Sequence, residues 1–216
     1  MVTGMRVLPM GDRALLVEVD DLAAVLDLRA RLDAARPDGV RDLVPAARTV
    51  LVDLDPRVLP LAAARSWVER VAAADPPPAA HVASGPEVGL RIRYDGPDLD
   101  STAALLGLDR AALIRAHRDA AWTVAFTGFA PGFGYLVARD WPHDVPRLDS
   151  PRTWVPAGAV GLAAGFTGAY PRDTPGGWRL LGTLDPVDTA ALFDPDAASP
   201  SLLAPGTPVR FREVQP

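Results

Sequence analysis

The chain has 216 residues, of which 49% are hydrophobic and 23% charged, and its formal net charge is −5. This length allows one large domain or two small ones, and it is enough to bury a core without disulfides or a structural metal. The negative charge predicts that the chain binds neither nucleic acid nor an anionic membrane surface.

Several residue types are missing, and their absence excludes whole classes of chemistry. All 22 basic residues are arginine, and the chain contains no lysine, cysteine or asparagine. It therefore cannot form a lysine Schiff base, use a P-loop lysine or carry biotin or lipoate on lysine. It also cannot offer a thiol nucleophile, a thiolate metal site or an N-glycosylation site.

No stretch approaches the roughly 18 consecutive apolar residues of a membrane helix. Residues 1–10 contain no apolar run typical of a signal peptide, so we expect a cytoplasmic protein that does not bind membranes. The three histidines, His81, His117 and His143, lack the spacing of metal ligands, and no metal site is predicted.

The first eighty residues predict a small α/β domain. Residues 14–19 and 49–54 are short, apolar and rich in valine and leucine, as expected for strands. Asp21 is positioned to cap a helix over residues 22–32, and a second helix is predicted after Pro60. Three consecutive prolines make residues 75–86 the predicted linker, which gives domains of residues 1–80 and 87–216.

The second domain is predicted to begin with a strand at residues 88–94. Helices are expected over residues 101–106 and 110–118, with Asp100 and Asp109 as N-caps. From residue 122 onward, glycines and prolines separate short apolar stretches, which favours a β-barrel or β-sandwich with functional loops. Those stretches are residues 122–126, 160–164, 178–184 and 208–214.

Three loop-rich segments, residues 126–135, 145–160 and 163–178, are candidates for a binding site. Residues 126–135 combine glycines with aromatic rings, and residues 163–178 could form a nest of backbone N–H groups for an anion. Between them, Arg147 and Arg152 could together bind a carboxylate or phosphate. For each segment an ordinary explanation stays open: packed turns in the two glycine-rich segments, and ion pairs from the arginines to Asp144 and Asp149.

His117 and Asp173 are further candidates. His117 is expected in the last turn of a helix, where it could interact with the terminal carbonyls or serve in proton transfer. Asp173 lies within a glycine-rich loop, but the spacing of the carboxylates does not single out a catalytic pair.

Taken in order, these segments resemble a family known as the B subunit of 5-oxoprolinase, as allophanate hydrolase subunit 1 or as the KipI family. Each motif alone is unspecific, and the ordered set covers nearly the whole chain. The matching segments are residues 11–18, 44–48 and 51–56, then His117, and then residues 127–136, 146–148, 151–153, 155–158, 167–171 and 175–178.

The resemblance implies an α+β fold, in which a small N-terminal α/β domain is followed by a cyclophilin-like β-barrel domain. It implies a non-autonomous subunit of a hydrolase that opens 5-oxoproline to glutamate with ATP. The expected partners are the 5-oxoprolinase C subunit, in a tight heteromer, and the A subunit. The expected cofactor is ATP, with any Mg²⁺ held by the complex.

With this resemblance, His117 and Arg152 become the candidate catalytic residues, and Arg147 a substrate-binding residue. His117 is assigned to proton transfer or orientation, and Arg152→Ala is expected to abolish turnover without unfolding the chain. The remaining predicted substrate-binding residues are Thr127, Gly128, Phe129, Pro131, Gly132, Tyr135, Gly158, Thr167, Gly168, Tyr170, Gly176 and Gly177.

Other functions stay open. One branch of the family binds and inhibits a histidine kinase, and related sequences form part of carboxyltransferases or act on another amide, such as allophanate. A stand-alone prolyl isomerase is the weakest alternative, because a shared fold does not carry activity. The chain also departs from the common family pattern at residues 165–166 and 182–184.

Overall fold

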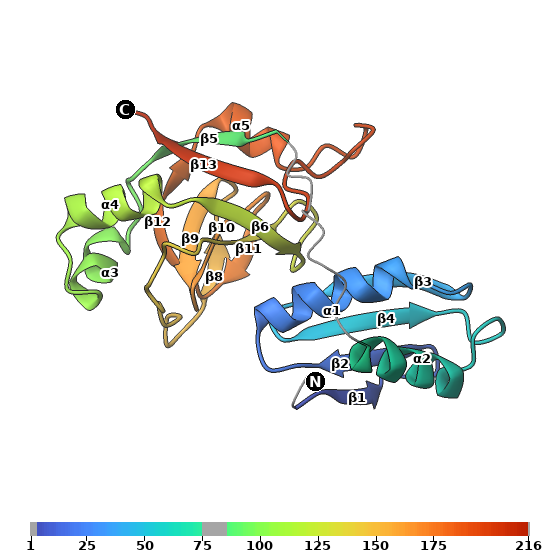
Figure 1. Ribbon diagram of the computed structural model, residues 1–216. Helices are drawn as coiled ribbons and strands as arrows, with labels where there is room; N and C mark the ends of the chain where they lie inside the picture. Colours follow the sequence, from blue (N-terminus) through green and yellow to red (C-terminus); the bar gives the residue numbers. More distant parts are fainter. Residues whose placement is uncertain (1–3, 75–85, 216) are drawn as a thin grey trace. The chain divides into compact units, whose positions relative to one another are not determined.

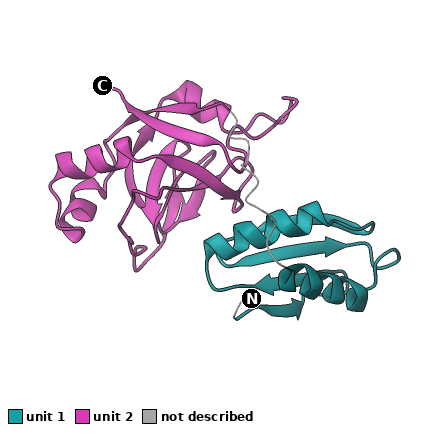
Figure 2. Ribbon diagram, viewed as in Figure 1, with its two compact units in different colours: residues 1–81 teal, residues 82–216 magenta. Residues whose placement is uncertain are grey.

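The computed structural model describes residues 4–74 and 86–215 (Figure 1). The chain divides into two compact units, residues 1–81 and residues 82–216, which are described separately (Figure 2). Residues 75–85 of the predicted linker lie outside the described residues.

The first unit is an antiparallel sheet covered by two helices. Its strand order is β1-β2-β4-β3, and both helices, which contact each other, pack against this sheet. Alternate residues of β4 (Val50, Val52 and Leu54) are buried, as expected for a strand with one face against a core. The elements are β1 (Arg6–Pro9), β2 (Ala14–Glu18), α1 (Leu22–Ala34), β3 (Val40–Pro45), β4 (Thr49–Leu54) and α2 (Leu61–Ala73).

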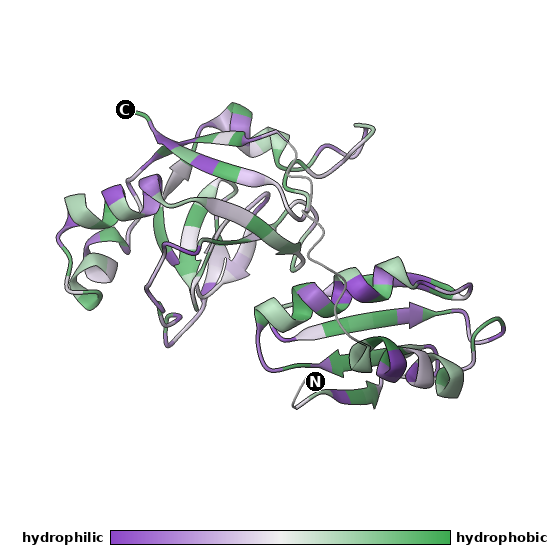
Figure 3. Cartoon of the chain, viewed as in Figure 1, coloured by the Kyte–Doolittle hydropathy of each residue, from purple (hydrophilic) through white to green (hydrophobic). Residues whose placement is uncertain are grey.

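Both predicted helix starts in this unit are confirmed. The side chain of Asp21 accepts a hydrogen bond from the backbone N–H of Ala24 at 2.9 Å, and α2 begins directly after Pro60. Figure 3 shows mixed hydrophobic and hydrophilic residues along α1 and α2. β1 and β3, the two edge strands, were not predicted from the sequence.

The second unit contains a closed seven-strand barrel with the order β10-β7-β6-β13-β5-β12-β9. Closure leaves no free sheet edge within the barrel. A separate two-stranded sheet pairs β8 with β11. The strands are β5 (Val88–Arg93), β6 (Trp122–Thr127), β7 (Gly134–Val137), β8 (Arg152–Val155), β9 (Ala159–Ala163), β10 (Phe166–Ala169), β11 (Thr174–Gly176), β12 (Arg179–Leu184) and β13 (Pro208–Glu213).

Three helices accompany the barrel: α3 (Leu99–Leu105), α4 (Arg110–Asp119) and α5 (Pro186–Ala191). Asp109 caps α4 as predicted, with its carboxylate accepting from the N–H of Ala112 at 2.6 Å. The helix predicted over residues 101–106 is present as α3, but its N-cap was predicted wrongly. Asp98 rather than Asp100 takes the N-cap position, because the turn after β5 ends at Asp98, whose N–H is bonded to the carbonyl of Leu180, and Asp100 lies in the first turn of the helix.

The barrel encloses the larger core of the second unit. Trp122, Phe211 and Leu136 are among the fully buried side chains at its centre. Within the described residues, no helix combines the length and apolar character needed to cross a membrane. The α+β fold class with a β-barrel is therefore confirmed.

Candidate functional site

The three loop-rich segments contain short strands rather than open loops. They supply β7, β8, β10 and β11, and they gather aromatic rings around Phe133. The ring of Phe133 lies 5.0 Å from that of Tyr135, 5.3 Å from Tyr170 and 5.4 Å from Trp178, between ring centres. All three contacts are edge-to-face, the arrangement in which the aromatic quadrupoles attract each other. Aromatic side chains from distant parts of the sequence therefore form one cluster, which we call the Phe133 cluster.

The positive charge of Arg147 acts on the two tyrosines of the Phe133 cluster. Burial raises the pKa of Tyr170 to about 12, and the nearby positive charges of Arg147 and Arg152 oppose this shift. Burial also raises the pKa of Tyr135, again opposed by Arg147. The loop that carries Arg147 is fixed, because Leu148 donates its backbone N–H to the carbonyl of Gly177 at 2.8 Å.

Arg147 is exposed and forms no ion pair with any acid in the described residues. The alternative in which it pairs with Asp144 or Asp149 is therefore not observed in this part of the chain. An exposed guanidinium offers several hydrogen-bond donors to a carboxylate or phosphate.

Arg152, on β8, forms an ion pair with a different acid. Its Nη2 donates to Oδ1 of Asp98 at 2.7 Å, and Oδ2 of Asp98 accepts from the backbone N–H of Leu180 at 2.7 Å. Asp98 is 7% exposed, so its charge requires these partners. An anion bound by Arg152 would therefore compete with Asp98. Arg147 has no acidic partner in the described residues and could bind an anion without such competition.

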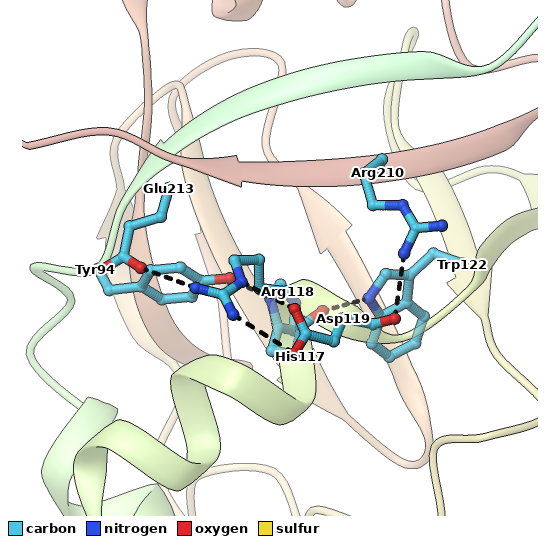
Figure 4. A network of polar contacts seen from close by, with 7 residues as sticks. All are labelled: Tyr94, His117, Arg118, Asp119, Trp122, Arg210 and Glu213. Atoms are coloured by element: carbon cyan, nitrogen blue, oxygen red, sulfur yellow. Dashed lines mark hydrogen bonds and ion pairs between the residues drawn. The ribbon is translucent and has the colours of Figure 1, made fainter.

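His117 is fully buried inside the barrel, with 0% exposure. Its ring packs 4.6 Å from Phe211 and 5.4 Å from Trp122, between ring centres. Its side chain makes no bond to the helix-terminal carbonyls, but its own backbone carbonyl accepts from Nε1 of Trp122 at 2.8 Å. Figure 4 shows His117 between Tyr94 and Trp122, with Arg118 and Asp119 beside it.

The hydrogen bonds of His117 assign its tautomer. The Thr167 hydroxyl donates to the carbonyl of Gly161 at 3.1 Å, so its oxygen accepts the proton on Nε2 of His117 at 2.9 Å. Nδ1 is then an acceptor for the Tyr94 hydroxyl, also at 2.9 Å. Burial lowers the pKa of His117 to about 3, in agreement with this neutral ring. His117 contacts Thr167 but has no exposed surface with which to contact a ligand.

The other predicted substrate-binding residues fall into groups that differ in burial. Phe129 and Pro131 are exposed, whereas Thr127, Gly128, Tyr135, Gly176 and Gly177 are half-buried. Tyr170 is buried within the Phe133 cluster. The buried positions are Gly132, Gly158, Thr167 and Gly168.

Close packing explains two of these buried or half-buried glycines. A Cβ on Gly168 would approach the carbonyl of Gly134 to 2.8 Å, and one on Gly176 would approach the Tyr170 hydroxyl to 2.6 Å. Gly176 is paired with Arg152 across the β8–β11 sheet, so this contact brings Tyr170 to the same strand pair as Arg152.

The predicted anion nest in residues 163–178 begins with a β-hairpin. Ala163 pairs with Phe166, and the two residues between them, Ala164 and Gly165, both have positive φ angles (50° and 77°). This is the geometry of a tight two-residue hairpin turn, the ordinary alternative that the sequence left open. Asp173 accepts a hydrogen bond from the backbone N–H of Ala157 at 2.9 Å.

Sequence reasoning missed Tyr94, Asp98 and Trp154. Asp98 and Arg152 are 54 residues apart, and Tyr94 and His117 are 23 apart, so no local spacing could reveal either pair. Trp154, with 57% exposure, could have been noticed as an aromatic residue within a proline-rich segment.

Comparison with known proteins shows the family to which the chain belongs. The profile of the family "Carboxyltransferase domain, subdomain C and D" matches residues 5–203. The B subunit of 5-oxoprolinase from Escherichia coli O157:H7 is 44% identical over 116 residues, which are 54% of this chain and 51% of that protein. Its counterpart from Bacillus subtilis is 41% identical over 119 residues, 55% of this chain and 48% of that protein. The chain thus matches about half the length of these relatives.

Solved structures are similar as well. The protein PH0987 from Pyrococcus horikoshii is 31% identical, with a TM-score of 0.55 over 97% of both chains. The urea amidolyase of K. lactis gives a TM-score of 0.80 over 97% of this chain and 15% of that protein, at 19% identity, which shows the fold alone. The resemblance to the B subunit of 5-oxoprolinase is confirmed, and the chain belongs to the family of the carboxyltransferase domain, subdomains C and D.

Proposed function

We propose that this chain is one subunit of an ATP-dependent 5-oxoprolinase complex that opens 5-oxoproline to glutamate. Its partners in the proposal are the C subunit of 5-oxoprolinase, in a tight heteromer, and the A subunit. The main support comes from relatives that are 40–44% identical and are named as the B subunit of 5-oxoprolinase. The matched part is about half of those relatives, so the activity and the partners are assigned to the complex rather than to this chain alone.

Arg147 is the structural observation that best supports this proposal. Its exposed guanidinium has no acidic partner in the described residues, and its charge acts on the phenols of Tyr135 and Tyr170. 5-Oxoproline carries a carboxylate, and the reaction with ATP involves phosphate. Arg147 suits either anion, because guanidinium groups bind carboxylates and phosphates through paired hydrogen bonds.

ATP supplies the phosphoryl group that activates the amide carbonyl toward water. The residue of this chain that best fits such an anionic group is Arg147. The contribution of this chain is to bind and orient anionic groups, with any Mg²⁺ held by the complex.

His117 has an indirect role in this proposal. The ring is enclosed by aromatic side chains and bonded to Thr167 and Tyr94, so it orients β10 rather than exchanging protons with a ligand. Of the two roles predicted for His117, its burial supports orientation.

The test is glutamate release from 5-oxoproline, measured with ATP for this chain alone and with candidate A and C subunits. We expect activity only in the complete mixture, with loss of activity when this chain is omitted. Arg147→Gln should reduce turnover at least about tenfold, since it removes a charged hydrogen bond. Arg139→Gln, at another exposed arginine, is the matched control. An assembled mixture that releases no glutamate would refute the proposal.

A carboxyltransferase acting on another amide is the second candidate, favoured by the description of the family that matches residues 5–203. This reaction requires a biotinylated carrier, which must be a separate protein or domain because the chain has no lysine. Carboxyl transfer from a biotinylated carrier to urea, with no glutamate release from 5-oxoproline, would favour this candidate.

A further inference from the structure

The first unit leaves one face of its sheet without a helix. Both α1 and α2 share a single apolar core with alternate residues of the strands, among them Val50 and Val52 of β4. The residues between these point to the opposite face, and in an antiparallel sheet such a face is normally polar. β4 follows this rule at Thr49 and Asp53, but between them it places Leu51 on the open face.

Leu51 belongs to an apolar row that crosses the whole sheet. It lies directly opposite Leu16 of β2 and Val44 of β3, and Leu16 lies opposite Leu8 of β1. Val44 is 39% exposed, and the other three side chains are half-buried. Neighbouring strands are about 4.8 Å apart, so these four residues, which we call the Leu51 row, extend over about 14 Å. An apolar surface rimmed by polar residues is typical of an interaction site.

Two carboxylates lie beside this row on the same face. Asp53 of β4 and Asp42 of β3 are directly opposite each other, and each is two residues from a member of the Leu51 row. Like charges in directly opposite positions destabilise an antiparallel sheet. Asp42 accepts a hydrogen bond from the N–H of Leu43 at 2.8 Å, but neither acid forms an ion pair within the part of the chain that the structure describes. The open face therefore combines an apolar row with negative charge that is not balanced.

This charge pattern argues against a second copy of the chain as the occupant. The basic residues within the four strands are Arg6 and Arg41. Arg6 is paired with Glu18 at 3.0 Å, and Arg41 with Asp55 at 3.1 Å. A second copy that packed through the same strands would add two more carboxylates and no free cation. A partner with arginine or lysine beside an apolar stripe would instead complement the face.

The partner has to recognise side chains rather than backbone. The inner strands β2 and β4 each pair with a strand on both sides, so their backbone groups are already used. An α-helix suits such a surface, because it satisfies its own backbone hydrogen bonds. About ten helical residues, at 1.5 Å each, span the length of the Leu51 row, and an amphipathic helix carries its apolar stripe between polar residues.

We infer that the open face of the first unit binds an amphipathic helix of another protein. The apolar stripe of this helix packs on the Leu51 row, and its arginine or lysine side chains pair with Asp42 and Asp53. Helices then cover both faces of the sheet, which is a common layered arrangement. The inference goes beyond the proposed function and does not depend on it, because Arg147 and the Phe133 cluster belong to the barrel unit.

The binding experiment uses the full chain and two synthetic peptides. Each peptide has about 15 residues, a stripe of leucines and a hydrocarbon staple on its far side that keeps it helical. Arginines border the stripe in one peptide, and glutamates take their places in the other. We expect the arginine peptide to bind saturably in fluorescence anisotropy, at least about fivefold more tightly than the glutamate peptide. Equal affinities, or no saturable binding of the arginine peptide, would overturn the inference.

Variants of the open face locate the binding. Asp42→Asn and Asp53→Asn each remove one charge, and Val44→Thr keeps the shape of the side chain but adds a hydroxyl. Each should weaken the arginine peptide at least about threefold. Asp38→Asn is the matched control, because it makes the same charge change at an exposed residue in the turn before β3. Wild-type affinity in all three variants, or an equal loss in Asp38→Asn, would refute the site.

The free chain gives a readout that a merely structural role would not produce. Because Asp42 and Asp53 repel each other, Asp53→Asn should raise the urea midpoint of the first unit relative to Asp38→Asn while it weakens the peptide. A midpoint at or below that of the control would remove the charge argument and overturn the inference.

Sedimentation of the chain alone tests the second copy as an occupant. We expect a species that does not self-associate through this face. A dimer that Val44→Glu dissociates would show that a second copy occupies the face, and it would overturn the inference.

Discussion

The two units differ in the polar side chains that they bury. The first unit covers one face of an open four-stranded sheet, and its core is apolar apart from Arg31, whose guanidinium binds the carbonyls of Val71 and Ala74 at the end of α2. The barrel unit instead encloses His117 and Thr167 at its centre and Asp98 at its side. Buried polar networks are stable only when each member is satisfied. The barrel unit is therefore where a single substitution should affect structure and site together.

The largest expected effect comes from His117→Ala. The variant loses two buried hydrogen bonds, leaves the Tyr94 hydroxyl without a partner and Thr167 with only its bond to Gly161, and creates a cavity among aromatic rings. Such changes cost about 3–5 kcal/mol. Native-state hydrogen exchange should show lost protection in the barrel strands and unchanged protection in β2 and β4. Equal loss in both units would contradict the separation between them.

The reciprocal change is Leu54→Ala, in the core of the first unit, where Leu54 has 0% exposure. Removing this side chain should cost about 3 kcal/mol through lost burial and an unfilled cavity. In the same exchange experiment, protection should fall in β2, β3 and β4 while the amides of β6 and β13 stay protected. A spread of the loss into the barrel would show that the two cores are energetically coupled.

The fold was predictable where local signals were strong. The cap at Asp21 and the proline before α2 have direct local causes, and both were correctly placed. The missed strands β7, β8, β10 and β11 are only three or four residues long, so their identity depends on pairing with other strands. β7, β10 and β11 also contain glycine or proline, residues that favour turns, and tertiary context decides such segments.

The candidate site was predictable as a set of segments but not as a set of contacts. The glycines and aromatic residues of residues 126–135 marked the Phe133 cluster, and the spacing of Arg147 and Arg152 marked two donors. Sequence could not show that Asp98 neutralises Arg152, since that pair spans 54 positions and two different elements. Nor could it show that His117 faces inward, because helical spacing fixes the face of a residue only relative to its own helix.

Acid should destabilise the barrel unit through His117, an effect smaller than the two core substitutions. Burial lowers the pKa of His117 to about 3 from the ordinary 6.5, so between these values the unfolded chain binds a proton that the folded chain does not. Stability therefore falls as pH falls through this range. Between pH 7 and pH 5 the loss from this residue is about 2 kcal/mol.

The measurement is urea unfolding at several pH values, with hydrogen exchange used to monitor the barrel unit. His117→Gln cannot titrate, so its stability should change less between pH 7 and pH 5 than that of the wild type. An identical pH dependence in both proteins would mean that His117 is not the titrating group. The first unit, whose described residues include no histidine, serves as an internal reference.

The smallest effect concerns Phe129, which has a φ angle of 68° and 58% exposure. A residue with a Cβ is strained in this left-handed region, whereas glycine is not, and the difference is about 1 kcal/mol. Comparing Phe129→Gly with Phe129→Ala isolates this strain, because both variants lose the same edge contacts to Phe133 and Tyr170. We expect the glycine variant to be more stable by about 1 kcal/mol in urea unfolding. Equal stability would mean that the loop relaxes once the ring is gone. In that case the contacts of Phe129 within the Phe133 cluster, rather than the backbone of residues 128–132, hold this edge of the site in place.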